Sequence, residues 1–153
     1  MGKTGTKRRG FTLVELAVVV MILGIMAAIA VPRLLGASQQ AADNAARQSV
    51  SVIREAIDQY AAQHGGALPG ADGAEGTFKA DLADYLRGSE FPTCPVGEAK
   101  NSAVRIVAGT GAISQGIGQT AATYSWAYQY ETGDFCVNSK DLCVDGVTTY
   151  DAF

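Results

Sequence analysis

Residues 11–32 read FTLVELAVVVMILGIMAAIAVP, and this stretch decides how the rest of the chain is organised. Its only charged side chain is that of Glu15, and residues 16–31 carry no polar side chain. The hydrocarbon core of a bilayer is about 30 Å thick and needs about 20 helical residues to cross it. Residues 11–35 supply that length, so the stretch predicts one membrane-spanning helix near the N-terminus.

A short basic segment precedes this helix. Residues 1–10, MGKTGTKRRG, contain four Lys and Arg residues and no acid, whereas the whole 153-residue chain has a formal net charge of −3. Basic residues before a span keep that end in the cytoplasm, so we expect the rest of the chain to cross outward. The acidic balance elsewhere gives no reason to expect a nucleic-acid partner.

Glu15 separates three interpretations of the apolar stretch. A cleaved signal peptide and a plain membrane anchor both account for the hydrophobicity, but neither gives a reason for an acid. An acid at the centre of a membrane helix costs about 2.5–3.5 kcal/mol on insertion scales, and less near an end. Cleavage after Gly10 would make Phe11 a new N-terminus, and its α-amino group, or that of a neighbouring chain, could neutralise the carboxylate.

Residues 7–15, KRRGFTLVE, resemble the N-terminal signature of type IV pilins and type II secretion pseudopilins. The resemblance implies that a prepilin peptidase cuts after Gly10 and N-methylates Phe11. It also implies that Glu15 pairs with the N-terminus of a neighbouring subunit during assembly. Pro32 matches the proline at which the helix of these proteins kinks or locally melts.

The chain after Pro32 has the pattern of an amphipathic helix. Apolar side chains recur at spacings of three and four residues and form one stripe: Ala46, Val50, Ile53, Ile57 and Tyr60. Two glycines follow His64 and can end the helix. We therefore expect one helix from Thr12 to His64, about 80 Å long, whose second half needs a partner layer.

The C-terminal half has the chemistry of strands. A short helix is expected after Thr77, which we expect to cap it, and strands are expected at residues 104–107, 123–130 and 135–138, with a pairing segment at 147–150. We expect a small antiparallel sheet of three or four strands on the helical stripe, which is an α+β fold. The resemblance implies a leader at 1–10, a transmembrane and assembly helix at 11–35 and a pilin-like domain at 36–153.

Three cysteines could form one disulfide bond if the domain is exported to an oxidising compartment. Six residues separate Cys136 from Cys143, and a hairpin turning at residues 139–140 would place them opposite each other. We therefore predict a Cys136–Cys143 bond. A bond from Cys94 to either of the other two is the alternative.

Four acids lie in the last twenty residues: Asp134, Asp141, Asp145 and Asp151. They are expected to be solvated turn residues, or else part of a calcium-binding loop. Major pseudopilins hold calcium in a C-terminal loop, but this sequence has no clear match to that loop, so no ligand is assigned. The only histidine, His64, stands at a helix end beside two glycines. We therefore predict no catalytic residue, no other cofactor and no enzymatic activity.

The resemblance implies a structural subunit that polymerises through its N-terminal helix, in a pseudopilus of type II secretion. The short domain without a long cysteine-bounded loop favours this over a type IV pilin for adhesion, motility or DNA uptake. A membrane-tethered binding module that never polymerises is a further alternative. Expected partners are copies of the chain, the prepilin peptidase, minor pseudopilins and an inner-membrane assembly platform. The expected location is the inner membrane, with the domain in the periplasm, and then the filament.

Overall fold

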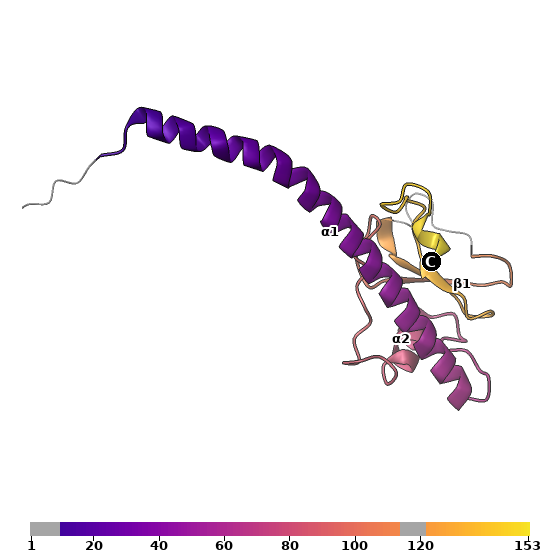
Figure 1. The fold of residues 1–153 in the computed structure, drawn as a ribbon. Coiled ribbons are helices and arrows are strands. Elements are labelled where there is room, and N and C mark those ends of the chain that lie inside the picture. The colour runs from indigo at the N-terminus through magenta and orange to yellow at the C-terminus, as the bar shows by residue number, and fades with distance from the viewer. Residues whose placement is uncertain (1–9, 114–121) are drawn as a thin grey trace, which may run out of the picture. The chain divides into compact units, whose positions relative to one another are not determined.

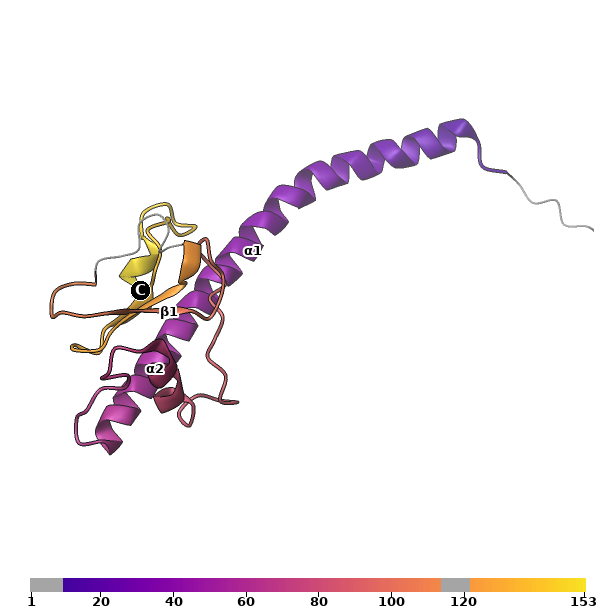
Figure 2. The same cartoon turned by 180° about the vertical axis from the view of Figure 1, so that it is seen from behind.

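A computed structural model describes residues 10–113 and 122–153. The elements are α1 (Leu13–Gln63), α2 (Glu75–Leu82), β1 (Val104–Val107), β2 (Trp126–Gln129), β3 (Phe135–Val137) and a final 3-10 turn, η1 (Tyr150–Ala152). The chain forms two compact units, one ending at Ser38 and the other running from Gln39 to Phe153, and α1 contributes residues to both. The α+β class predicted from the sequence is confirmed, with α1 beside the small sheet in the second unit (Figures 1 and 2).

The long helix begins and ends where the sequence predicts, within one residue at each end. It is continuous through Pro32, so this proline does not end it. At the C-terminal end, the amide of Gly66 donates to the carbonyl of Ala61 over 2.8 Å, while Gly65 has a φ of 66°. A left-handed glycine with this backward bond is a common way to satisfy the last carbonyls of a helix. The kink expected at Pro32 stays a prediction.

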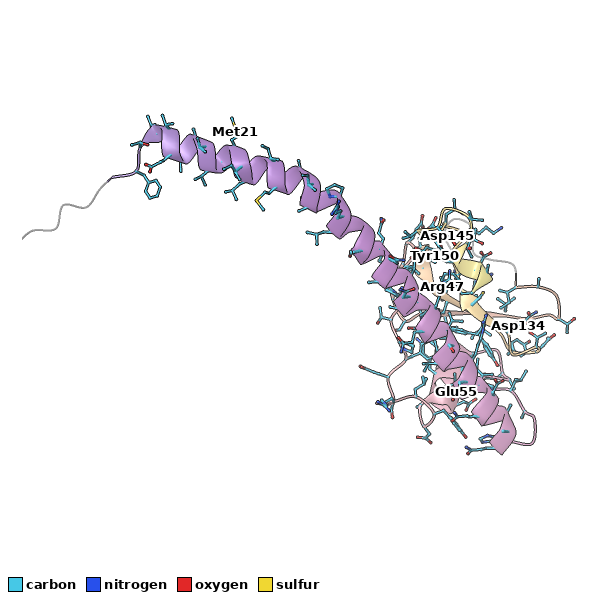
Figure 3. All side chains as sticks on the ribbon, in the orientation of Figure 1. Met21, Arg47, Glu55, Asp134, Asp145 and Tyr150 are labelled. Carbon is cyan, nitrogen blue, oxygen red and sulfur yellow. The ribbon has the colours of Figure 1, made fainter. Side chains whose placement is uncertain are left out.

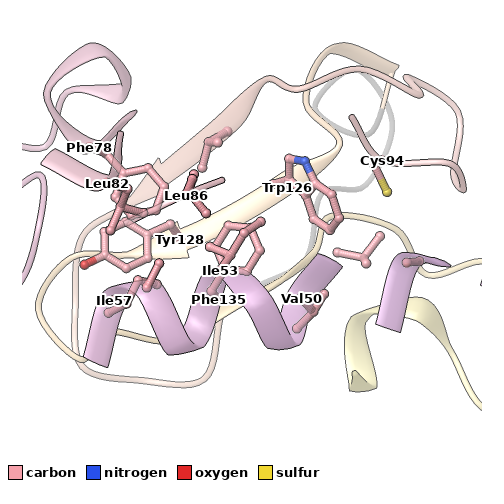
Figure 4. Close-up of a cluster of buried hydrophobic side chains, with 14 of the residues drawn as sticks. Val50, Ile53, Ile57, Phe78, Leu82, Leu86, Cys94, Trp126, Tyr128 and Phe135 are labelled. Atoms are coloured by element: carbon pink, nitrogen blue, oxygen red, sulfur yellow. The ribbon is translucent and has the colours of Figure 1, made fainter. Parts of the chain in front are cut away.

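The apolar stripe of α1 forms the core of the second unit (Figure 4). Ala46, Val50, Ile53 and Ile57 are each at most 2% exposed, which confirms the predicted periodicity. They pack against side chains from the sheet and from α2 and the turn after it: Phe78, Leu82, Leu86, Trp126, Tyr128, Phe135 and Val137. Burial of apolar area on this scale is the main stabilising contribution in a small domain.

The sheet is mixed, and the expectation of a purely antiparallel sheet is wrong. Strand β2 pairs antiparallel with β3, as the intervening turn predicts, but it pairs parallel with β1. A parallel pair needs a crossover of a dozen or more residues, and residues 108–125 supply one. Residues 114–121 of this connection lie outside the described part of the chain.

Two local expectations also change. Thr77 lies inside α2, whose N-cap is Ala74; Asp72 organises this helix start by accepting bonds from the Ala74 amide and the Thr77 hydroxyl. In the C-terminal segment, only one isolated bridge forms, between Leu142 and Thr149. Residues 147–150 therefore add no fourth strand to the part of the sheet that the structure describes.

Gly70 is a position where only glycine fits. Its φ is 65°, and a Cβ built there would lie 2.8 Å from the Cβ of Phe78. Its amide donates to Asp81 over 2.8 Å, which holds the turn against α2. Left-handed backbone and a contact this short both penalise any L side chain.

We expect Gly70→Ala to lower the free energy of unfolding by about 1–3 kcal/mol. The measurement is urea unfolding of the fragment 36–153, which retains the whole core of the second unit. Gly76→Ala is the matched control, because Gly76 lies in α2 with no atom within 4 Å of the added Cβ. The control should be neutral, or stabilising by up to about 1 kcal/mol. Equal stability of the two variants would contradict the assigned turn.

Candidate processing and assembly segment

A capping box starts α1. The backbone amide and the hydroxyl of Thr12 each donate to Oε2 of Glu15 over 3.1 Å, and the amide of Glu15 donates back to the Thr12 hydroxyl over 3.2 Å. The carbonyl of Thr12 then accepts from the amide of Leu16. This reciprocal pairing satisfies amides that have no partner inside the helix. Sequence reasoning placed Glu15 in the first turn but missed its bonds to Thr12, which the T-x-x-E spacing could have revealed.

The peptide bond between Gly10 and Phe11 lies just before this cap, in chain without regular structure. Gly10 is exposed and has no atom within 4 Å of where a Cβ would stand, and Phe11 is 83% exposed. Proteases act on accessible, non-helical backbone. The predicted processing bond is therefore open to a peptidase in this structure.

The helix that follows is apolar on every side (Figure 3, around Met21). Its large apolar side chains between Leu13 and Leu34 are 47–86% exposed. Its length and composition would allow it to span a membrane, and over residues 10–113 and 122–153 nothing buries its most hydrophobic stretch. Contiguous apolar surface of this extent is not stable in water, so lipid or other protein chains must cover it.

Comparison with known proteins agrees with this geometry. The chain carries a prokaryotic N-terminal methylation motif, at residues 5–31. It is also similar to proteins named type II secretion system core protein G. The identity is 39% over 59 residues for the protein of Pectobacterium carotovorum subsp. carotovorum, 39% over 54 residues for that of Escherichia coli K12, and 44% over 54 residues for that of Vibrio cholerae.

These alignments cover 35–39% of this chain and 37–38% of each relative. The chain thus matches less than two fifths of the length of these curated relatives. No solved structure gives a significant match. The resemblance of the methylation-motif segment to prepilin-like proteins is confirmed.

In the second unit, a buried acid that sequence reasoning did not single out joins the C-terminal segment to α1. Asp43 is 6% exposed. Its Oδ1 accepts from the Tyr150 hydroxyl over 2.6 Å, and its Oδ2 accepts from the Val144 amide over 2.8 Å. Burial and the bond to Asp43 both raise the pKa of Tyr150 above its ordinary value. One carboxylate thereby satisfies two donors that are 101 and 107 residues away along the chain.

Two arginines one and three turns further along α1 complete this attachment. The Arg54 guanidinium donates to the carbonyl of Phe135 over 2.7 and 3.0 Å and to the carbonyl of Phe153. The Arg47 guanidinium lies 3.8 Å from the centre of the Phe153 ring, at cation–π distance. Charged groups at the rim of the stripe therefore align β3 and the C-terminal turn on the helix.

The four C-terminal acids do not gather into one site. Asp134 and Asp145 lie apart (Figure 3). Each of Asp134, Asp141 and Asp145 accepts hydrogen bonds within its own turn. Over residues 10–113 and 122–153, no three acidic, histidine or cysteine side chains are grouped as metal ligands. These three acids are turn residues, whereas Asp151 has one carboxylate oxygen that is buried without a hydrogen-bond partner among the described residues. The calcium loop stays a prediction without a ligand set.

Cys94, Cys136 and Cys143 are free, buried thiols, so the disulfide predicted between Cys136 and Cys143 is not formed in this structure. The hairpin expected at residues 139–140 does not exist, because Leu142 pairs with Thr149 instead of with β3. Cys136 packs with Ala127 and Ile113 in a small second cluster. Cys143 instead lines a pocket beside Asp43.

We expect Cys94 and Cys136 to resist iodoacetamide in the native protein at pH 8. Burial raises the pKa of both Cys94 and Cys136 to about 11, so very little reactive thiolate forms. After denaturation without reductant, intact mass should show three alkylated cysteines per chain. Protein in which Cys136 and Cys143 are alkylated only after reduction would restore the predicted disulfide.

Proposed function

We propose that this chain is a structural subunit of a type II secretion pseudopilus, polymerising through α1 after removal of residues 1–10. One observation carries the proposal: an accessible Gly10–Phe11 bond leads directly into a Thr12–Glu15 capping box and a helix that is apolar on every side. The methylation motif and the names of the similar proteins support it. The proposal assigns no catalytic role to any residue.

Glu15 has capacity for a partner from another chain. An ionised carboxylate offers about four lone-pair positions, and both bonds from Thr12 go to Oε2. An α-amino group at position 11 of an adjacent subunit would neutralise the acid in an apolar surrounding, where an unpaired charge is costly. Because the same carboxylate caps α1, each bond to it would also order the start of the helix.

The proposed location follows from the same segment. The basic residues before Phe11 would hold residues 1–10 in the cytoplasm, where a prepilin peptidase cuts after Gly10 and methylates Phe11. The second unit would then fold on the periplasmic side, with the assembly platform and minor pseudopilins as partners. In the membrane, α1 is covered by lipid; in the filament, copies of the same helix take the place of lipid.

Mass spectrometry of the protein purified from membranes tests the processing step. We expect a mature chain that begins at Phe11 and is one methyl group heavier than its sequence. Gly10→Val should leave the leader attached, because a branched side chain is placed beside the bond to be cut. Gly5→Val, a matched change within the leader, should be processed normally. A mature protein beginning at Met1, or after residue 25, would contradict the proposal.

Three variants separate the charge of Glu15 from its capping role. Glu15→Gln keeps an acceptor for the Thr12 amide but loses the charge, whereas Thr12→Ala loses the hydroxyl and keeps the charge. We expect Glu15→Gln and Glu15→Ala to enter the membrane and form no filaments. Thr12→Ala should still form filaments, at reduced yield. Electron microscopy and membrane fractionation give the two measurements; normal filaments from both Glu15 variants would favour a non-polymerising membrane tether.

A further inference from the structure

The C-terminal turn between Asp141 and Thr149 presents apolar side chains to solvent. Leu142 is 56% exposed, Val144 48% and Val147 83%. In the described residues of the second unit, the only other exposed large apolar side chain is Val52 on α1. Three such residues within six positions form an exposed apolar tip, which we define as Leu142, Val144 and Val147.

This apolar tip is held in shape by several hydrogen bonds. The amide of Cys143 donates to the carbonyl of Thr148 over 2.8 Å, and that of Gly146 donates to the carbonyl of Cys143 over 2.9 Å. Asp145 accepts from the amides of Val147 and Thr148, each over 2.9 Å. An ordered loop presents its apolar residues with little entropy left to lose on binding.

The tip is also fixed to α1. The amide of Val144 donates to Asp43, the buried acid whose other oxygen accepts from Tyr150. Asp43 stands near the beginning of the second unit, which starts at Gln39. The apolar tip is therefore attached close to Gln39, where α1 enters the second unit.

The charges around the tip indicate its partner. Asp141 precedes the apolar tip and Asp145 lies within it, while Arg47 of α1 lines a pocket beside Asp145. Hydrogen bonds from Thr148 and the neighbouring amides lower the pKa of Asp145 to about 2, so it is ionised at neutral pH. These acids oppose docking on an anionic lipid surface. A complementary surface would be apolar and carry a cation.

The N-terminal segment of α1 in another copy is a surface of this kind, because it is apolar and carries one cation. Between Glu15 and Asp43 the only charged residue is Arg33. It is exposed, and it is flanked by exposed Ile29 and Leu34, at 57% and 68%. Apolar area would be buried on both sides of such a contact, while Arg33 faces the acids of the tip.

We propose that the apolar tip docks on residues 29–34 of α1 in a second copy of this chain, with Asp145 facing Arg33. This inference rests on the proposed polymerisation and names the surface that the second unit contributes to it. The tip would then cover residues 29–34, at the C-terminal end of the apolar segment of α1 in the second copy. A buried apolar contact of this kind sets the axial position of one copy against the next, because Arg33 is the only charged residue between Glu15 and Asp43 of the helix on which the tip docks.

Cross-linking between two co-expressed chains tests the contact. One chain carries Val147→Cys and the other carries Leu34→Cys, both otherwise unchanged and produced with the peptidase and assembly platform. We expect an oxidised dimer only when both variants are present. Either variant alone controls for the native thiols, and Val52→Cys with Leu34→Cys is the matched control, because Val52 is exposed but distant in sequence from the tip.

A charge test follows on the same pair. Asp145→Asn keeps the oxygen that accepts the Val147 and Thr148 amides but removes the charge, and Arg33→Gln removes the cation. Each change should lower the dimer yield by about threefold at low salt, and the two together should lower it no further than one alone. Additive losses would exclude the Asp145–Arg33 pairing.

The outcomes separate this inference from the proposed function. Filaments that form without the Val147–Leu34 cross-link would overturn the docking of the tip and leave polymerisation intact. Cross-linking at the same yield in the Val52 control would overturn it as well, since the contact would be unspecific. A chain that never forms filaments would overturn both.

Discussion

The structure depends on how the apolar surface of one helix is covered. From Leu13 to Leu34, α1 is not covered by the described residues of its own chain and must take cover from lipid or from other chains. From Ala46 onward, the same helix keeps only one apolar stripe, and the sheet and α2 cover it. The hydrophobic effect thus acts between molecules at one end of the helix and within the molecule at the other.

Between Leu34 and Ala46, α1 changes from a helix that is apolar on every side to a helix with one apolar stripe. The helix runs on through Pro32, although this proline has no amide hydrogen to donate, while the side chains change from uniformly apolar to one-sided. The second unit has its own buried core, which includes no residue of the apolar segment. In the proposed function, such a domain would remain folded while its helix moves from a lipid environment to a protein one.

Two carboxylates on α1 use the same chemistry for different ends. Glu15 accepts from Thr12 and so defines where the helix begins. Asp43 accepts from Val144 and Tyr150 and so ties the C-terminal turn to the helix. In each case an acid in an apolar setting is kept because it satisfies donors that would otherwise lack partners. Glu15 can accept a further bond from another chain, and Asp43 holds the apolar tip that we propose docks on a second copy.

The sequence by itself determined the extent of α1, its apolar and amphipathic halves, and the segment around Gly10, Phe11 and Glu15. These depend on local periodicity, on helix-ending glycines and on short motifs, all of which are visible within a few turns. The positions of the three strands were also predictable from their β-branched and aromatic residues.

Only the tertiary structure decided the parallel pairing of β1 with β2, the different surroundings of Cys136 and Cys143, and the role of Asp43. Strand direction depends on the path of the residue 108–125 connection, and a hairpin was the simpler but incorrect choice for residues 136–143. The partners of Asp43 lie 101 and 107 residues away. Contacts at such separations are selected by the packing of the whole core, because local propensity contains no information about which distant donor will meet a given acceptor.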